Sequence, residues 1–211
     1  MNSTPASLSL SVERIPVGAI DTICYVVSNV SGSAVIIDPG AEPEKILLRL
    51  QEKSRKPVAI LLTHGHYDHI EGVALIKDTF SIPVMGSNDD AFLLESGLQS
   101  VFSGRPITPV TLDISLTDGQ ELLLIGTRWV VIATPGHSPG SLTFLTGSWA
   151  FTGDTLFADG GIGRTDLWGG SLKALKASLE KKLFCLPSAT IVYPGHGNHS
   201  TIGQEKRFHR Q

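Results

Sequence analysis

Short runs of apolar residues, separated by turn residues, fill the first half of the chain. Residues 22–28 and 58–62 are rich in β-branched and aliphatic side chains, which is typical of buried strands. Between them, Ile46, Leu47 and Leu50 have the spacing of a helix that buries one face. Strand-like and helix-like runs alternate in this way up to about Ser115. The expected strands are 8–12, 22–28, 34–38 and 58–62, and the expected helices are 43–53 and a stretch after His69 that ends at Phe80.

The pattern becomes mostly strand-like after Asp118-Gly119. We expect strands at 122–125, 128–133, 142–145 and 149–151, one helix at 171–184, and a last short strand at 191–193. So many strands need two faces buried, which favours two sheets covered by helices. The chain has no repeat, charge block or low-complexity linker. We therefore predict a single α/β domain over residues 1–211.

Composition limits the partners and the location. The chain has 17 Lys and Arg against 20 Asp and Glu, a formal charge of −3, whereas nucleic-acid binders normally carry a basic stripe. The longest apolar run, 58–62, is far shorter than the roughly 20 residues that span a bilayer. The N-terminus has neither the positive charge nor the apolar stretch of a signal peptide. The chain has two cysteines, Cys24 and Cys185, which lie far apart in the sequence and indicate no disulfide framework. We expect a cytoplasmic protein with no nucleic-acid or membrane partner, and nothing indicates its oligomeric state.

The most informative segment directly follows the predicted strand 58–62. It reads Thr-His-Gly-His-Tyr-Asp-His and brings His64, His66, Asp68 and His69 within six residues. In a random chain of this length and composition, the pattern His-x-His-x-Asp-His would arise with a probability of about 4 in 10,000. Chance is therefore a poor explanation. Side chains that follow a strand collect at the carboxyl end of a sheet, where crevices form. Imidazoles with a carboxylate favour zinc, iron or manganese over calcium or magnesium.

Three later segments repeat the arrangement of a strand, a glycine-containing turn and a ligand-type residue. They end in His137, Asp154 and His196. The glycines let the backbone turn tightly. Together with the first motif they give five histidines and two aspartates, more than one four-coordinate zinc can use. We therefore predict two divalent metal ions, zinc first, with iron or manganese as alternatives. His199 and His209 lack this context and are interpreted as ordinary surface or capping residues.

Other residues near these motifs have two interpretations each. Asp38 is either a surface turn residue or a support for a ligand, and we prefer support because a metal-bound histidine needs its other ring N–H held. Thr63, beside the first ligand, is assigned to support in the same way. Tyr67 either packs in the core or lines the entrance. Arg164 either pairs structurally with Asp166 or binds a substrate carboxylate.

These motifs resemble, in order, those of the metallo-β-lactamase superfamily. The matching segments are 38–40, 63–69, 136–138, 153–155 and 194–196. The resemblance implies a four-layer αβ/βα sandwich of two mixed sheets flanked by helices, with the metals at one edge. It also implies a role for each ligand: one metal held by His64, His66 and His137, a second held by Asp68, His69 and His196, and Asp154 as the bridge between them.

Within the superfamily the chain is most similar to short bacterial glyoxalase II-like (hydroxyacylglutathione hydrolase-like) proteins, on segments 152–157, 163–166 and 194–206. This implies that a metal-bound hydroxide cleaves a thioester, S-D-lactoylglutathione or a related hydroxyacylglutathione, with Asp68 and Asp154 as the catalytic carboxylates. Asp154 also differs from the cysteine that the commonest true β-lactamases carry there. Full-length glyoxalase II has a C-terminal helical extension that supplies much of its glutathione site. This chain has 15 residues after His196, so the resemblance does not identify the thiol.

Three other functions fit the same residues. Segment 163–166 also resembles persulfide dioxygenases of the superfamily, in which His64, His137 and Asp154 would hold a single iron as a two-histidine, one-carboxylate triad. A lactonase would use the same hydrolytic chemistry. A non-catalytic metal-binding module shares the fold, since fold does not fix function. A complete ligand set argues against that module, whereas the ligands do not separate a hydrolase from a dioxygenase.

Overall fold

The computed structural model describes residues 9–95, 98–104 and 106–209. Leu8, at the start of the predicted strand 8–12, lies outside them, and the single domain over 1–211 stays a prediction. The chain folds into two six-stranded sheets. The first sheet has the order β1 (Leu10–Val17), β2 (Thr22–Asn29), β3 (Ser33–Ile37), β4 (Lys56–Leu61), β5 (Val84–Gly86) and β6 (Ile114–Ser115). The second has the order β12 (Ser200–Thr201), β11 (Ile191–Pro194), β10 (Trp149–Gly153), β9 (Leu142–Thr146), β8 (Thr127–Ala133) and β7 (Glu121–Leu124).

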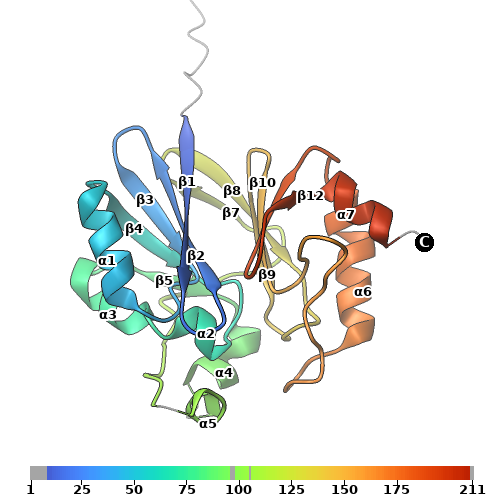
Figure 1. Cartoon of the computed structure of the whole chain (residues 1–211), viewed down its shortest axis with the longest axis horizontal. Coiled ribbons are helices and arrows are strands. Elements are labelled where there is room, and N and C mark those ends of the chain that lie inside the picture. The colour runs from blue at the N-terminus through green and yellow to red at the C-terminus, as the bar shows by residue number, and fades with distance from the viewer. Residues whose placement is uncertain (1–8, 96–97, 105, 210–211) are drawn as a thin grey trace, which may run out of the picture.

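Helices cover the outer faces of both sheets (Figure 1). Both sheets are mixed, because β3, β4, β5 and β6 pair in parallel and β10 pairs with β11 in parallel, whereas the other pairs are antiparallel. This arrangement confirms the predicted sandwich of two mixed sheets flanked by helices. The helices are α1 (Pro43–Glu52) and α3 (Val73–Phe80) on the first sheet, α6 (Leu172–Lys181) and α7 (Ile202–Phe208) on the second, and α2 (Tyr67–Ile70), α4 (Ala91–Glu95) and α5 (Leu98–Ser103) at one edge.

The central strands are apolar on both faces because each face is covered. In β2, Ile23, Tyr25 and Val27 belong to the core between the two sheets. Cys24 and Val26 alternate with them and belong to the core beneath α1 and α3. This alternation explains why β2 reads as one continuous apolar run in the sequence.

The structure has elements that the sequence pattern did not assign. No individual element was predicted between Phe80 and Ser115, where β5, α4, α5 and β6 lie, because runs of two to six residues carry too little periodicity. The prediction that 191–193 is the last strand was wrong, since β12 follows it, and α7 after β12 was not predicted. The Thr201 hydroxyl accepts a hydrogen bond from the Gln204 N–H (3.2 Å) and begins α7, and Ile202 is buried against α6.

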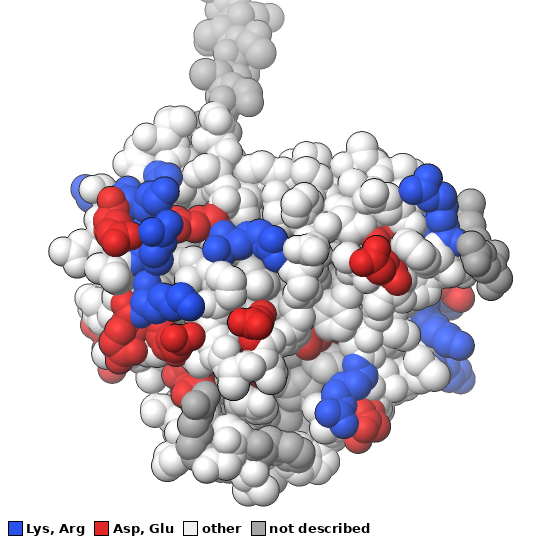
Figure 2. Space-filling view, viewed as in Figure 1, with Lys and Arg blue, Asp and Glu red and all other residues white. Residues whose placement is uncertain are grey.

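The cysteines, the helices and the surface charges bear on three features considered in the sequence. Cys24 is buried and Cys185 exposed, and both are free thiols. Among the described residues, no helix combines the length and the apolar composition that crossing a bilayer requires. On the face shown in Figure 2, Lys and Arg lie among Asp and Glu instead of forming one basic stripe. In α1, for example, Arg49 pairs with Glu13 at 2.5 Å and with Glu52 at 2.7 Å.

Aromatic side chains fill the core between the sheets. The Phe151 ring is fully buried, with its centroid 5.1 Å from that of Tyr193 and 5.2 Å from that of Tyr25. We expect Phe151→Ala to lower the free energy of unfolding by about 3–5 kcal/mol, because the cavity between two sheets closes poorly. Urea unfolding followed by circular dichroism measures this change. Leu123→Ala is the control, because Leu123 is 80% exposed and its loss should change stability by less than about 0.5 kcal/mol. Equal effects of the two substitutions would contradict this account of the core.

Candidate metal centre

The seven predicted ligands lie together at the carboxyl ends of four strands. His64 and His66 occupy the loop after β4, and Asp68 and His69 follow in α2. The remaining three come from the second sheet: His137 after β8, Asp154 after β10 and His196 after β11. The two sheets therefore contribute ligands to one shared edge, where α/β folds form their binding crevices.

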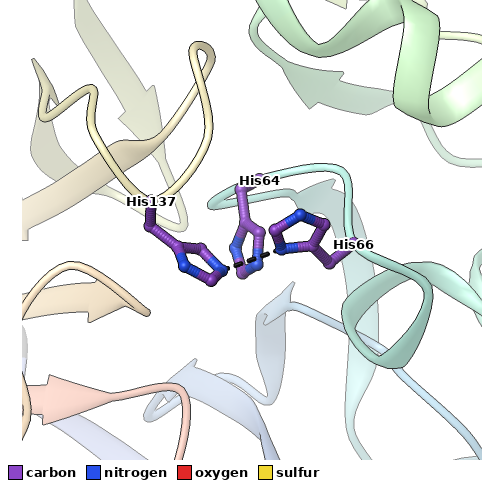
Figure 3. Close-up of side chains that lie close together, drawn as sticks. All are labelled: His64, His66 and His137. Carbon is purple, nitrogen blue, oxygen red and sulfur yellow. Dashed lines mark hydrogen bonds between the residues drawn. The ribbon is translucent and has the colours of Figure 1, made fainter. Parts of the chain in front are cut away.

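His64, His66 and His137 form the first group of side chains. Each offers one ligand atom, and these atoms lie within 4.8 Å of one another. Figure 3 shows the three rings converging from the β4 and β8 loops, with His66 Nδ1 2.8 Å from His137 Nε2. All three side chains are buried. Three converging imidazoles are a suitable set for one transition-metal ion.

Asp68, His69 and His196 form the second group, also within 4.8 Å. Asp68 Oδ2 lies 3.2 Å from His69 Nε2 and 3.3 Å from His196 Nε2. Asp154 lies between the two groups. Its Oδ1 is 3.4 Å from His69 Nε2, and its Oδ2 is 3.5 Å from His196 Nε2 and 3.6 Å from His137 Nε2. Asp154 therefore contacts both groups, as a bridging ligand would.

Several buried polar atoms in this cluster have no hydrogen-bond partner among the described residues. They include His64 Nε2, His69 Nε2 and Asp154 Oδ1. An unpaired buried polar group costs about 1–3 kcal/mol, so atoms of this kind are rare in folded proteins. A divalent cation at each group would satisfy them. The residues present therefore fit a metal site.

Asp38 and Thr63 fix the orientation of two of the rings. The Asp38 carboxylate accepts hydrogen bonds from the Thr63 N–H (2.7 Å) and hydroxyl (2.6 Å), and it faces His69 Nδ1 at 2.9 Å. Because the Thr63 hydroxyl donates its only proton to Asp38, its oxygen accepts from His64 Nδ1 at 3.0 Å. His64 and His69 thus carry their protons on Nδ1 and turn Nε2 into the site.

Backbone carbonyls orient two further rings. His137 Nδ1 donates to the Arg164 carbonyl at 2.8 Å, and His196 Nδ1 donates to the Ile20 carbonyl at 3.1 Å. A carbonyl only accepts, so both rings carry a proton on Nδ1 and turn Nε2 into the site. Gly195 is required beside them, because a Cβ at that position would lie 2.1 Å from Asp154 Oδ1.

Sequence reasoning missed three residues that contact the ligand loops. The Thr22 hydroxyl donates to Asp68 Oδ2 at 2.8 Å, and Gln99 Oε1 accepts from the Tyr67 N–H at 2.9 Å. Buried Asp90 accepts from the Gly65 N–H at 2.8 Å. Each contact joins segments 25 or more residues apart, so no local pattern in the sequence signals it.

A pocket of about 540 Å³ opens onto the cluster. Tyr67 lines it and also packs against the core beneath α1 and α3. Arg164 lines it as well, and its guanidinium makes two 2.7 Å hydrogen bonds to the Asp166 carboxylate. Both side chains of that pair are more than 60% exposed. The other residues that line the pocket outside the ligand groups and Asp154 are Ile20, Gln99, Phe157, Leu167 and Trp168.

Comparison with known proteins identifies the family. A model of the metallo-beta-lactamase superfamily matches residues 17–196. The chain belongs to this superfamily. It is 39% identical to the hydroxyacylglutathione hydrolase GloC of Haemophilus influenzae, over 94% of this chain and 96% of that protein. The His/Asp cluster, in a member of this superfamily of metallo-hydrolases, indicates a divalent-metal site.

Two solved structures are similar to this chain over nearly their whole length. The BLEG-1 B3 metallo-beta-lactamase has a TM-score of 0.89 and 42% identity, and the alignment covers 93% of this chain and 97% of that one. TTHA1623, solved in a di-iron-bound form, has a TM-score of 0.84 and 40% identity, with 93% and 98% coverage.

The pKa values of the histidines differ between the two ligand groups. Burial lowers the pKa of His64 well below its ordinary value, and burial with the neighbouring histidines lowers the pKa of His66 to about 4. Burial also acts against charge on His69 and His196. The nearby carboxylates overcome it, raising the pKa of His69 well above its ordinary value and that of His196 to about 9. Without metal, His64 and His66 are neutral, whereas His69 and His196 hold protons.

The carboxylates of the site stay ionised. Burial alone would raise the pKa of Asp68 and Asp154, but His69 and His196 hold both values well below the ordinary range. In the metal-free protein these ionised carboxylates lie beside protonated histidines, and a bound cation would supply that positive charge in place of the protons.

We expect metal binding at the second group to release about two protons near pH 7, from His69 and His196, because the metal competes with the proton for the same nitrogen. His64 and His66 are neutral at that pH and should release none. Apparent affinity at the second group should therefore rise with pH up to about 9, the pKa of His196. Isothermal titration calorimetry in buffers of different ionisation enthalpy counts these protons. His196→Gln should lower the count by one, and an unchanged count would contradict the assignment.

Proposed function

We propose that the protein is a metal-dependent hydrolase that cleaves a thioester, S-D-lactoylglutathione or a related hydroxyacylglutathione. The observation that carries the proposal is the presence of two ligand groups joined by Asp154 at the end of one pocket. The similarity to a hydroxyacylglutathione hydrolase over nearly the full length supports the substrate class. In this proposal the protein acts on a small molecule in the cytoplasm, without a nucleic-acid or membrane partner.

Each group would hold one divalent ion, zinc first and iron or manganese as alternatives. His64, His66 and His137 would hold one ion, and Asp68, His69 and His196 the other, with Asp154 between them. Two ions in such a site supply a nucleophile at neutral pH, by lowering the pKa of a bound water, and a Lewis acid for the substrate carbonyl.

The chain's own residues orient the reactants. Asp68 is ionised, its Oδ2 is fixed by the Thr22 hydroxyl, and it faces the pocket, where it can accept a hydrogen bond from the attacking water. Phe157 and Trp168 form apolar walls that exclude bulk water from the bound thioester. The leaving thiolate needs no strong proton donor, because thiols have pKa values near 8.5.

The bridging position is tested by Asp154→Ala. We expect thioester turnover to fall below detection. Loss of a supporting residue typically lowers metal affinity 10–100-fold, and loss of a bridging ligand should lower it further. The metal content of the purified variant, measured by plasma emission, should therefore fall. Asp78→Ala is a matched control, because Asp78 is an exposed aspartate of α3 on the outer side of the first sheet. Retention of both metal and turnover by Asp154→Ala would show that the bridging role is wrong.

Arg164 is proposed to bind a carboxylate of the substrate in place of Asp166. An exposed ion pair is worth only about 0–1 kcal/mol, so exchanging one carboxylate for another costs little. Arg164→Ala should raise KM for an anionic thioester about tenfold, with little change in kcat. Asp166→Asn should lower KM, because it removes the competitor. A neutral thioester is the control substrate, and equal changes in its KM would contradict the role of charge.

A mononuclear-iron persulfide dioxygenase is the second candidate, since the 163–166 segment fits it and one similar structure binds iron. Metal analysis of the protein as purified, combined with S-lactoylglutathione hydrolysis and oxygen uptake on glutathione persulfide, separates the two. One iron per chain with oxygen consumption would overturn the hydrolase proposal. Lactones and a β-lactam belong in the same substrate panel, the latter because of the similarity to a B3 metallo-beta-lactamase. Metal binding without any turnover would favour a non-catalytic module.

A further inference from the structure

Asp90 is a buried carboxylate outside the predicted ligand set. It ends the short 3-10 turn Asn88–Asp90 after β5 and is 1% exposed. Its two oxygens accept three hydrogen bonds. Oδ2 accepts from the Gly65 N–H (2.8 Å) and the Ser138 hydroxyl (2.7 Å), and Oδ1 accepts from the Gly140 N–H (2.6 Å). All three donors lie outside the turn that contains Asp90, so the carboxylate connects this turn to other parts of the chain.

The three donors belong to two loops that come from different sheets. Gly65 lies between His64 and His66 in the loop after β4 of the first sheet. Ser138 directly follows His137 in the loop after β8 of the second sheet, and Gly140 lies two residues further on. The Asp90 carboxylate thus joins the two loops that carry all three histidines of the first group.

The packing around Asp90 leaves little freedom. A Cβ on Gly140 would lie 2.6 Å from Asp90 Cγ, and a Cβ on Gly65 would lie 3.3 Å from Asp90 Cβ. Both glycines therefore permit the carboxylate to approach the two loops. The Ser138 hydroxyl is held further by Ser141 Oγ at 2.8 Å, which fixes its direction.

We propose that Asp90 is a positioning residue for the metal ion of the first group. It holds the β4 and β8 loops at the separation at which His64, His66 and His137 converge. The inference rests on the metal site of the proposed function. Ligand positions must be held to within about 0.5 Å, and loss of a supporting partner typically costs 10–100-fold in metal affinity. Because its donors flank only first-group ligands, Asp90 acts on that ion selectively.

The second group has a different support. His69 faces the Asp38 carboxylate, and the Thr22 hydroxyl holds Asp68. Asp90 makes none of these contacts. A change at Asp90 that merely weakened the fold would loosen both groups, whereas a positioning role weakens one.

The test is Asp90→Asn, which keeps the shape but replaces one acceptor oxygen with a donor that faces the loop N–H groups. Metal-free protein is titrated with Co²⁺ and followed by absorption and by the paramagnetically shifted ring N–H signals in NMR. His137→Ala identifies the signals that belong to the first group. We expect Asp90→Asn to weaken the first-group ion 10–100-fold and to change the second by less than about threefold.

Ser138→Ala removes one of the three donors and should weaken the same ion by a smaller factor, so it keeps the test valid if Asp90→Asn does not fold. Equal weakening at both groups, or no change at either in folded protein, would overturn the proposal. Absence of thioester turnover in the unsubstituted protein would contradict the proposed function but leave Co²⁺ binding and this test unchanged. An unsubstituted protein that binds no Co²⁺ at either group would overturn the metal site and this inference together. If it binds one ion at the first group only, the effect of Asp90 is still measured on that ion.

Discussion

The contact between the two sheets at their shared edge is the constraint on which the site depends. Neither sheet carries a complete first ligand group, because His64 and His66 come from one sheet and His137 from the other. Hydrogen bonds cross from sheet to sheet beside the ligands. The Leu142 N–H donates to the Thr63 carbonyl at 2.7 Å, and the Ile23 N–H donates to the Gly195 carbonyl at 2.7 Å. These bonds place the ligand loops after β4 and β11 at fixed distances from the opposite sheet.

The aromatic core supports the same edge from within. The Tyr25 hydroxyl donates to the Pro194 carbonyl at 2.7 Å, so a ring packed between the sheets also holds the loop that leads to His196. Burial raises the pKa of Tyr25 well above its ordinary value, which keeps this donor protonated at every physiological pH. Core packing and ligand geometry are therefore coupled through a single side chain, and loss of Tyr25 would affect both.

The side chains that cluster at the candidate site were easier to predict from the sequence than the elements that support them. The histidines and aspartates stand in short motifs after strong strands, and long apolar runs such as β2 and β4 were evident from periodicity. Short elements such as β5 and β12 were not, because their pairing depends on neighbouring strands. Asp90 could not be predicted, since it follows β5 and its role comes from contacts with loops 25 to 50 residues away along the chain.

The charge state of the carboxylates bears on the choice of substrate. Asp68 and Asp154 both have pKa values held well below the ordinary range, so neither can donate a proton at neutral pH. An amine or alkoxide leaving group benefits from a proton donor in the transition state, whereas a thiolate leaves readily without one. Bound metal would also remove the protons that His69 and His196 carry in the metal-free protein. Ionised carboxylates that cannot donate a proton thus agree with the thioester of the proposed function better than with an amide.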